Sequence, residues 1–325
     1  MICLGIESTA HTFGVGIADE KGNILSDEKD TYKSKEGWGI IPIESAEHHR
    51  EVADSLIQKA LAAASLEMKD IDLISFSQGP GLAPCLYAGL NKTMELSRNF
   101  SIPYIGVNHC VAHIEIGKIY AEQKDPVVVF TSGANTQIIS FNNGRYRIFG
   151  ETMDVGLGNA LDKFGRSAGI GFPAGPKIEE LGRSGKWIEL PYVVKGMDLS
   201  FSGIVTEASK RLEKGCRLED VCFSIQESMF SMVTEVTERA IAHLGKEEVM
   251  LTGGVAANRF LQEKLRIMSE ERKARFSACP MKLAGDNGAM IAWTGILAHK
   301  SGYKSEKGKI LPRWRADDME ISWMK

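Results

Sequence analysis

Short apolar runs alternate with longer amphipathic stretches along the first third of the chain, and this pattern predicts strands separated by helices. "MICLGIE" is an apolar run, small polar residues follow it, and "HTFGVGIAD" is a second β-like run, so together they predict a hairpin. Residues 43–65 and 82–100 carry apolar side chains at helical spacing. "IDLISFSQGPG" and "PYIGVNH" predict buried strands, the first ending in a Gly-Pro-Gly turn. Strands that alternate with helices indicate an α/β fold.

The same strand–turn–strand pattern starts again in the middle of the chain. "VVVFTSG" and "ANTQIIS" predict two strands, and "NNGR" after them is a hairpin turn of the Asn-Gly kind. Ser, Thr and Gly therefore follow a strand near residue 8 and again near residue 132, which predicts two related lobes. "EEVMLTGGVAANRFLQEKL" predicts a later strand, a Gly-Gly turn and a helix, and "LAGDNGAMIAWTGILAHKSG" predicts a final capped helix.

These elements divide the 325 residues into two predicted lobes, since the chain is too long for one ordinary core. We expect lobe I to span residues 1–120 and to be completed by residues 290–325. Lobe II is expected at residues 121–289, with a helical insertion at about residues 152–245.

Composition narrows the class of protein: 43% of the residues are apolar and 25% are charged, as in soluble globular proteins. No run approaches the roughly 18 apolar residues of a membrane helix, and the start has no signal-peptide pattern, so we expect a cytoplasmic protein without a membrane segment. The six cysteines form no CxxC pair, which favours buried thiols over a disulfide framework.

The net charge of −3 gives no overall attraction to nucleic acid, so binding to RNA would need a local patch or a partner. One candidate patch lies near the end of the chain, where a solvated tail is the alternative. It consists of Lys300, Lys304, Lys307, Lys309, Arg313 and Arg315.

Two turns, "TSGANT" and "TGGVAAN", place small residues directly after an apolar strand. Backbone N–H groups in such turns can approach a phosphate or ribose closely. Neither turn is a Walker P-loop or a GxGxxG motif, and each alone is a weak signal. Together with "IESTAHTFGVGIAD" they resemble the phosphate and adenosine loops of the actin/Hsp70/sugar-kinase superfold. That resemblance implies two related lobes with a nucleotide and metal cleft between them.

His109 and His113 lie four residues apart in "NHCVAH", so on a helix they would share one face. A divalent ion at an open site needs a third protein ligand, and Asp286 in "AGDNGAM" is the candidate. The spacing leaves alternatives open, because Asp286 at a helix start could simply be an N-cap. Cys110 could also be a ligand, although on a helix it would point about 100° away from His109, which favours a buried thiol.

Four other side chains have two interpretations each. His48 and His49 begin a predicted helix and could face the site or RNA, but a solvated helix start is favoured. His11 lies in the first hairpin turn and could approach phosphate. Trp38 could stack on a base or anchor its loop.

Seven segments occur in an order that resembles the universal tRNA threonylcarbamoyladenosine transferase family, in the form of the archaeal and eukaryotic KEOPS subunit. They are "NHCVAHIEIGK", "SGANTQI", "GETMDVGLGNALDKFGR", "GPKIEELG", "KGMDLSFSG", "TGGVAANRFL" and "GDNGAMIAWTG". The resemblance runs from Met1 to about Lys300. An older name of this family, O-sialoglycoprotein endopeptidase, implies a protease, but "HCVAH" has Cys110 where HExxH has its glutamate.

The resemblance implies a role for each matching residue. His109, His113 and Asp286 match the metal ligands, with Fe²⁺ the usual ion and zinc or magnesium as substitutes. Glu7 holds the acidic position of the first phosphate hairpin, where it could lie beside the phosphate or the metal. The residues expected to bind ATP or an adenylate are Phe130, Thr131, Ser132, Gly133 and Ala134 along the phosphate, Asp162 and Glu179 at the ribose, Gly175 at the adenosine, and Asn258.

The chain departs from the family pattern at three positions. Phe130 replaces the usual tyrosine, and Ala134 and Ala174 replace glycines. If the tyrosine oxygen holds or orients the metal, this chain lacks it. Each added methyl is expected to limit how closely the backbone approaches phosphate or base, which tunes the site without abolishing it.

The implied activity is transfer of threonylcarbamoyl from threonylcarbamoyl-adenylate to N6 of the adenosine 3′ of the anticodon, in tRNAs that read ANN codons, with release of AMP. The implied partners are tRNA and the other KEOPS subunits. Among these is a small atypical kinase/ATPase, which in some archaea is fused after this domain. The alternatives are a non-catalytic ATP-binding scaffold or regulatory protein of the same fold, which Phe130 supports, and a metalloprotease.

Overall fold

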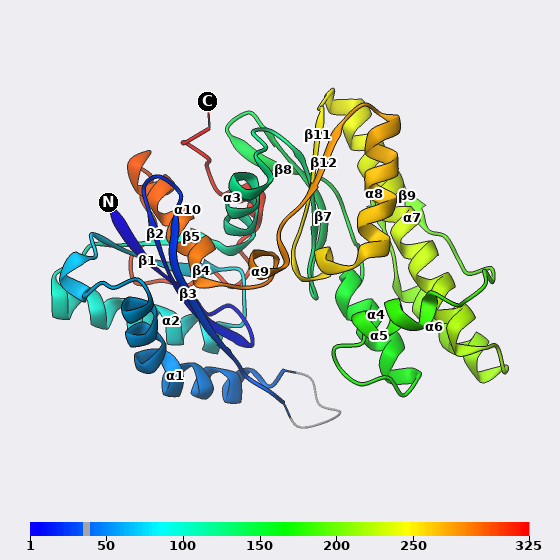
Figure 1. Cartoon of the computed structure of the whole chain (residues 1–325), viewed down its shortest axis with the longest axis horizontal. Helices are drawn as coiled ribbons and strands as arrows, with labels where there is room; N and C mark the ends of the chain where they lie inside the picture. The colour runs from blue at the N-terminus through cyan, green and yellow to red at the C-terminus, as the bar shows by residue number, and fades with distance from the viewer. Residues whose placement is uncertain (35–39, 325) are drawn as a thin grey trace. The chain divides into compact units, whose positions relative to one another are not determined.

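The computed structural model describes residues 1–34 and 40–324, so Trp38 lies outside the described residues. The chain forms two compact units, each with its own sheet (Figure 1). Unit 1 contains Met1–Ile119, Asn142–Tyr146 and Gly285–Lys325, and unit 2 contains Tyr120–Phe141 and Arg147–Ala284.

The sheet of unit 1 has five strands in the order β3-β2-β1-β4-β5. β1 (Ile2–Glu7), β2 (Thr12–Asp19) and β3 (Ile24–Thr31) form an antiparallel meander. β4 (Leu73–Gly79) and β5 (Tyr104–Asn108) run parallel to β1. The carboxyl ends of β1, β4 and β5 therefore meet at one edge of the sheet. This edge carries the candidate chemistry of unit 1.

Helices cover both faces of this sheet. α1 (Pro42–Ala63) and α2 (Ala83–Phe100) pack on each other and on one face, and α10 (Gly288–Lys300) packs on the strands of the other face. Alternate residues of the strands serve the two sides, so apolar side chains such as Leu4 join the core beneath α1. The helices and strands predicted in the first third of the sequence are confirmed, with end points that differ by a few residues.

Glycines let α10 lie directly on the backbone of β2. A Cβ atom on Gly16 would lie 2.1 Å from the backbone nitrogen of Ala289, and one on Gly288 would lie 2.1 Å from the backbone nitrogen of Gly16. No real Cβ atom tolerates such contacts with backbone, so both positions need glycine. The contact fixes the start of α10 against the sheet, and with it the residues just before that helix.

Unit 2 repeats the strand plan of unit 1, in the order β12-β11-β6-β7-β8. β6 (Val127–Thr131) and β7 (Thr136–Asn142) pair in antiparallel fashion, and β8 (Arg145–Glu151) follows. β11 (Glu248–Thr252) and β12 (Arg275–Ala278) are added parallel to β6 as β4 and β5 are to β1. The prediction of two related lobes is thereby confirmed at the level of topology.

Helices make up most of the segment between β8 and β11, as the sequence predicted. The tight turn that joins β7 to β8 uses Asn143 and Gly144, both with positive φ, as an Asn-Gly hairpin requires. The remaining elements of unit 2 are α4 (Leu157–Ser167), α5 (Gly175–Gly182), β9 (Val194–Lys195), β10 (Asp198–Leu199), α6 (Ser202–Glu213), α7 (Leu218–Leu244), α8 (Arg259–Glu271) and α9 (Met281–Ala284). α3 (His109–Ala121) follows β5 directly.

The close packing of α10 predicts a large effect of one added methyl group. Gly288→Ala should reduce the free energy of unfolding by about 1–3 kcal/mol or more, because the new Cβ meets backbone atoms that cannot move aside. Gly203→Ala in α6 is the matched control, since a Cβ there meets nothing within 4 Å. Thermal unfolding of both variants checks the prediction, and equal midpoints would contradict it.

Candidate metal centre and nucleotide loops

An asparagine side chain sets the start of α3 and so positions the first histidine. Asn108 is fully buried, and its Oδ1 accepts hydrogen bonds from the backbone N–H groups of Cys110 (2.9 Å) and Val111 (3.1 Å). These N–H groups have no partner inside the helix, so the asparagine acts as its cap. The rings of His109 and His113 then lie one turn apart, with centroids 4.7 Å apart and planes at 88°.

Asp286 reaches the same point from a segment far away in the sequence. Its Oδ1 lies 3.3 Å from Nε2 of His113 and 3.5 Å from Nε2 of His109. One ligand atom from each residue lies within 4.8 Å of the others. Asn287, not Asp286, caps α10, because its side chain accepts from the N–H of Met290 at 2.8 Å. The N-cap interpretation of Asp286 is therefore wrong, and the carboxylate faces the two imidazoles.

The donor set fits a divalent transition metal. Two ligands each about 2.1 Å from one ion lie about 3–4 Å apart, which is the range of the two nitrogen–oxygen distances here. Two imidazoles and one carboxylate are the ligands of sites that keep open coordination positions, and they suit Fe²⁺ as well as Zn²⁺. Cys110 is buried and is not part of this group, which confirms the buried-thiol interpretation.

Glu7 orients one of the two imidazoles. This carboxylate is fully buried, and its Oε2 lies 2.9 Å from Nδ1 of His109. Its other oxygen accepts from the backbone N–H and the hydroxyl of Thr9. With Nδ1 held by the carboxylate, Nε2 of His109 is directed to Asp286 and is left for an ion.

The electrostatics of the centre agree with this arrangement. Burial disfavours the imidazolium, but the carboxylates of Glu7 and Asp286 outweigh burial and raise the pKa of His109 to about 9. Burial, together with the charge on His109, lowers the pKa of His113. Burial would raise the pKa of Asp286, yet the two histidines hold it well below its usual range. The ionised Asp286 and the neutral His113 are in the forms that bind metal, whereas an ion bound at this centre must displace a proton from His109.

A second pair of histidines, His48 and His49, lies on α1, and His49 holds the turn that precedes β2. Nε2 of His49 lies 3.0 Å from the carbonyl oxygen of Ala10, and the hydroxyl of Ser45 donates to the same oxygen at 2.7 Å. His49 is fully buried, so the solvated-helix interpretation is wrong for it, while His48 lies 3.0 Å from Asp30. Burial lowers the pKa of His49 to about 4. The neutral ring thus fastens the turn that follows Glu7.

In unit 2, residues 131–135 form a compact loop beside the start of α4. The N–H of Ser132 donates to the carbonyl of Asn135 at 2.8 Å, and the N–H of Asn135 donates to the hydroxyl of Ser132 at 2.9 Å. Among the described residues, the N–H groups of Gly133 and Ala134 donate to no other group, and both residues are exposed. Successive unpaired N–H groups of this kind suit an anion. Phe130, just before the loop, is only 1% exposed.

The other predicted nucleotide residues bind backbone N–H groups at the starts of two helices of unit 2, α5 and α8. Oδ1 of Asp162, in α4, accepts from the N–H of Ala174 at 2.8 Å, and burial raises the pKa of this carboxyl. Oε1 of Glu179, in α5, accepts from the N–H of Arg259 at 3.1 Å. Asn258 caps α8, and its side chain accepts from the N–H of Leu261 at 3.0 Å. These hydrogen bonds fix the positions of α4, α5 and α8 relative to one another.

The two small residues between α4 and α5 differ in what surrounds them. A Cβ atom on Gly175 would meet nothing within 4 Å, so packing does not demand a glycine there. The methyl group of Ala174 is buried, and it lies where a Cβ on Gly165 would approach to 2.2 Å. That methyl therefore fills space above Gly165 inside the unit, so it has a packing role of its own.

Comparison with known proteins identifies the relatives of this chain. The family described as tRNA N6-adenosine threonylcarbamoyltransferase matches residues 23–293. A protein of that name from Thermococcus kodakarensis is 51% identical over 327 residues, covering 99% of this chain and 100% of the relative. A probable bifunctional tRNA threonylcarbamoyladenosine biosynthesis protein from Methanobrevibacter smithii is 50% identical, and this chain spans 60% of its length.

Solved structures with low sequence identity share the fold. T. kodakarensis HypF aligns with a TM-score of 0.64 at 14% identity, over 95% of this chain and 49% of that chain. A ROK family glucokinase from Streptomyces griseus, in complex with glucose and AMPPNP, aligns with a TM-score of 0.52 at 14% identity, over 91% and 99%. The prediction of a sugar-kinase-like α/β fold is confirmed. None of the described helices combines the length and apolar character that crossing a membrane requires.

The bond between Glu7 and His109 predicts a measurable loss of metal affinity. Glu7→Gln removes the charge that holds the ring, and affinity for Fe²⁺ or Zn²⁺ should fall about 10- to 100-fold. Competition with a chromophoric chelator under anaerobic conditions measures this change. Glu51→Gln, on the exposed side of α1, is the control and should bind metal as the unmodified chain does. Equal affinities for both variants would sink the orienting role of Glu7.

The buried His49 predicts a pH dependence of stability. Its folded-state pKa of about 4 lies below the ordinary value of 6.5, so the unfolded chain binds the proton more readily. The stability it contributes is complete above about pH 6.5 and is lost as the pH falls toward 4. His49→Gln should therefore lose less in unfolding midpoint between pH 7.5 and 5 than the unmodified chain. His299→Gln, at an exposed position, should behave like the unmodified chain, and identical pH profiles for all three would refute the assignment.

Proposed function

The chain belongs to the tRNA N6-adenosine threonylcarbamoyltransferase family, and from this premise we propose that it is a transferase acting on the adenosine 3′ of the anticodon. The donor is threonylcarbamoyl-adenylate, the acceptor is N6 of that adenosine in tRNAs that read ANN codons, and AMP is released. One observation carries the proposal. His109, His113 and Asp286 converge within unit 1, and all three lie inside the matched residues 23–293.

In this proposal the three converging side chains hold one divalent ion, with Fe²⁺ favoured and zinc or magnesium as alternatives. When bound, the ion supplies Lewis acidity to a phosphate or carbamoyl oxygen of the donor. His109 and His113 contribute Nε2, and Asp286 contributes a carboxylate oxygen. Glu7 keeps the imidazole of His109 in the orientation that binding requires.

The chemistry of the acceptor explains why position matters more than a nucleophilic side chain. The N6 amine of adenine is a poor nucleophile, because its lone pair is delocalised into the ring. The donor is a mixed anhydride with a good leaving group, so holding the two reactants in line can account for about 7–11 kcal/mol of the barrier. We propose direct attack of N6 on the carbamoyl carbon without a covalent enzyme intermediate.

The loop at residues 131–135 is proposed to bind the phosphate of the adenylate. The unpaired N–H groups of Gly133 and Ala134 supply two donors for an anionic oxygen. Ser132 holds the loop closed through its bond with Asn135, the hydroxyl of Thr131 donates to the carbonyl of Thr252 in β11, and Phe130 is buried in the core. Ala134 is exposed, so its methyl is available to limit how closely the backbone approaches the phosphate.

The helix starts around α5 are proposed to bind the nucleoside. Asp162 and Glu179 each spend one carboxylate oxygen on a backbone N–H, which leaves the second oxygen for a ribose hydroxyl. The open space beside Gly175 accommodates the adenosine. Asn258 positions the start of α8 next to them.

Partners are needed because the chain itself is close to neutral, with a net charge of −3, and phosphate contacts supply most of the affinity for RNA. We propose that it binds tRNA together with KEOPS subunits, among them a small atypical kinase/ATPase. The bifunctional relative from M. smithii, of which this chain spans 60%, is consistent with such a subunit encoded in the same chain. We also propose that the chain acts in the cytoplasm.

One reconstituted assay tests the proposal against its alternatives. The chain, its partner subunits, unmodified tRNA, threonine, bicarbonate, ATP and the adenylate-forming enzyme are combined, and the nucleosides are analysed by mass spectrometry. We expect threonylcarbamoyladenosine from the unmodified chain and at least a 100-fold lower rate from Asp286→Ala, which removes one of three ligands. His299→Ala, at the exposed end of α10, is the control and should retain the full rate.

Each alternative predicts a different outcome of the same assay. A non-catalytic scaffold gives no product from the unmodified chain although it binds ATP. A metalloprotease gives peptide cleavage that Asp286→Ala abolishes. Full product from Asp286→Ala would remove the role of the metal centre.

A further inference from the structure

A tight turn near the end of the chain lies on the carboxyl edge of the unit 1 sheet. Residues 311–314 form this turn, in which the N–H of Trp314 donates to the carbonyl of Leu311 at 3.0 Å. Pro312 occupies its second position, where the fixed φ of proline suits a β-turn. The N–H of Leu311 donates to the carbonyl of Gln78 at 2.7 Å, and the N–H of Gly81 donates to the carbonyl of Pro312 at 3.1 Å. The turn is therefore fastened to the end of β4.

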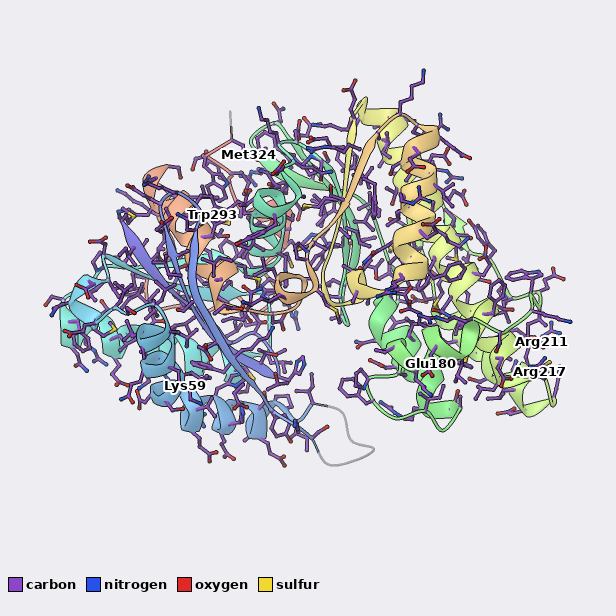
Figure 2. The ribbon with its side chains drawn as sticks, in the orientation of Figure 1. Lys59, Glu180, Arg211, Arg217, Trp293 and Met324 are labelled. Atoms are coloured by element: carbon purple, nitrogen blue, oxygen red, sulfur yellow. The ribbon has the colours of Figure 1, made fainter. Side chains whose placement is uncertain are left out.

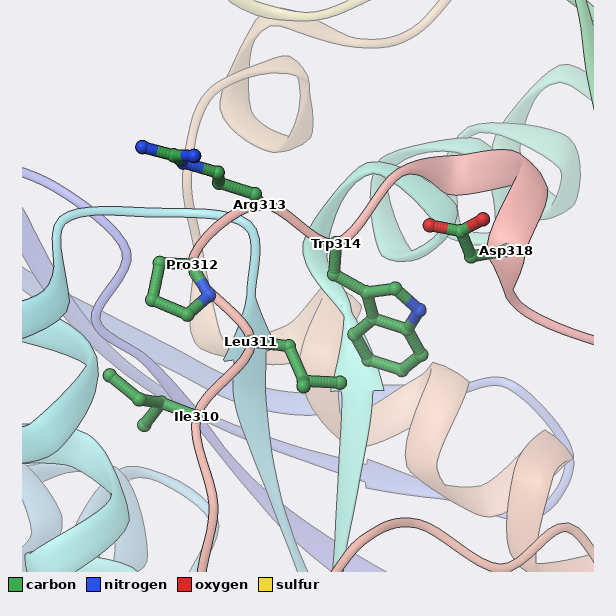
Figure 3. Close-up of a pocket in the computed structure, with 6 residues that line it drawn as sticks. All are labelled: Ile310, Leu311, Pro312, Arg313, Trp314 and Asp318. Carbon is green, nitrogen blue, oxygen red and sulfur yellow. The ribbon is translucent and has the colours of Figure 1, made fainter.

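An open hollow of about 480 Å³ lies at this turn, and we call it the tail hollow. Figure 3 shows the indole of Trp314 beside the side chain of Leu311, while Arg313 extends on the other side of the backbone. The carboxylate of Asp318 stands near the indole. The residues that line the hollow are Ile310, Leu311, Pro312, Arg313, Trp314 and Asp318.

The tail hollow is built on the same residues that build the metal centre. The side-chain amide of Asn108, which caps the start of α3, donates to the carbonyls of Trp314 (3.3 Å) and Arg315 (3.1 Å). On its other side, Gly81 lies so close to the turn after β1 that a Cβ would be 2.6 Å from the carbonyl oxygen of Thr9. Thr9 in turn lies 3.4 Å from Nδ1 of His109. The side chain of Asn108 and the turn at Thr9 thus connect the hollow to the metal ligand His109.

The basic residues of the last segment of the chain are only partly neutralised. Lys300, Lys309 and Arg315 form ion pairs with neighbouring carboxylates. Lys304, Lys307 and Arg313 are exposed, and within the described part of the chain they form no ion pair. Of these three, Arg313 is among the residues that line the hollow, where it adds a local positive charge in a chain of net charge −3.

We propose that the tail hollow binds one unpaired nucleotide of the tRNA anticodon loop, next to the adenosine that is modified. The inference rests on the proposed function, because it names the surface that presents the acceptor to the metal centre. The base stacks on the indole of Trp314, and a flanking phosphate contacts Arg313.

The chemistry of the hollow favours this occupant over an apolar peptide. An indole beside aliphatic side chains offers a face for stacking, which single-stranded bases use and which is worth about 1–3 kcal/mol per base. The unpaired guanidinium of Arg313 matches a phosphate, whereas an apolar segment would leave it without a partner. The carboxylate of Asp318 is an acceptor for a base amine or a ribose hydroxyl, and it stands on the indole side, apart from Arg313.

Binding of the full chain to unmodified tRNA tests the proposal directly. Trp314→Ala should raise the Kd about 5- to 150-fold through lost stacking, and Trp314→Phe should recover most of the affinity. Arg313→Ala should lower the slope of log K against log salt by about 0.7, as expected for one phosphate contact with a single strand. Because the side chain of Arg313 is exposed, Arg313→Ala should leave the fold intact. The salt-dependence measurement therefore remains valid even if Trp314→Ala unfolds the end of the chain.

Matched controls come from surfaces away from the hollow. Trp187→Ala removes a tryptophan of unit 2 that is 51% exposed, and Lys59→Ala removes a cation from the exposed side of α1 (Figure 2). Both should bind tRNA as the unmodified chain does. The proposal is overturned if Trp314→Ala and Arg313→Ala match these controls, or if they weaken only the binding of a partner subunit.

A second readout separates this proposal from the proposed function. An anticodon stem-loop with 2-aminopurine beside the target adenosine should lose fluorescence on binding, and Trp314→Ala should abolish that loss. If the quenching depends on Trp314 but the unmodified chain makes no product, nucleotide binding at the tail hollow is supported and the proposed transferase activity is refuted. If product forms and Trp314→Ala leaves the KM for tRNA unchanged, the transferase activity is supported and nucleotide binding at the tail hollow is refuted.

Discussion

The hydrogen bond between the buried carboxylate of Glu7 and the imidazole of His109 is the interaction on which the metal centre depends. A fully buried carboxylate must be satisfied by donors, and Glu7 has three, two from Thr9 and one from His109. The bond joins the end of β1 to the first residue of α3, so rotation of the ring would leave Oε2 of a buried carboxylate without this donor. The other ring nitrogen then faces Asp286, which the glycine contact between α10 and β2 holds in place.

At the carboxyl edge of the unit 1 sheet, single polar side chains make several structural hydrogen bonds each. Asn108 is the clearest case, because one amide side chain caps α3 with its oxygen and fastens the C-terminal turn with its nitrogen. The metal centre and the tail hollow therefore both depend on the hydrogen bonds of Asn108. This sharing follows from the parallel strands β1, β4 and β5, whose last residues necessarily lie side by side.

Unit 2 shows how residues can serve the fold and still be available for a ligand. Asp162 and Glu179 each bind one backbone N–H, and that bond fixes the direction of the remaining oxygen. Departures from the family pattern also differ in consequence. The methyl of Ala174 is absorbed by the space above Gly165, whereas Ala134 lies at the exposed loop. The same replacement of glycine by alanine is thus structural at one position and faces solvent at the other.

The sequence by itself determined the strand–helix alternation, the repeat of a hairpin-first lobe, the shared face of His109 and His113, and the family. These features depend on short-range periodicity and on motif order, which a linear chain displays directly. It did not reveal β3 and β12, because edge strands are polar or short and so lack an apolar signal. Only the tertiary structure decided that Asp286 faces the histidines while Asn287 caps the helix, and that His49 is buried beneath a turn. Such choices depend on which side chains meet across tens or hundreds of residues, and spacing along the chain carries no record of those contacts.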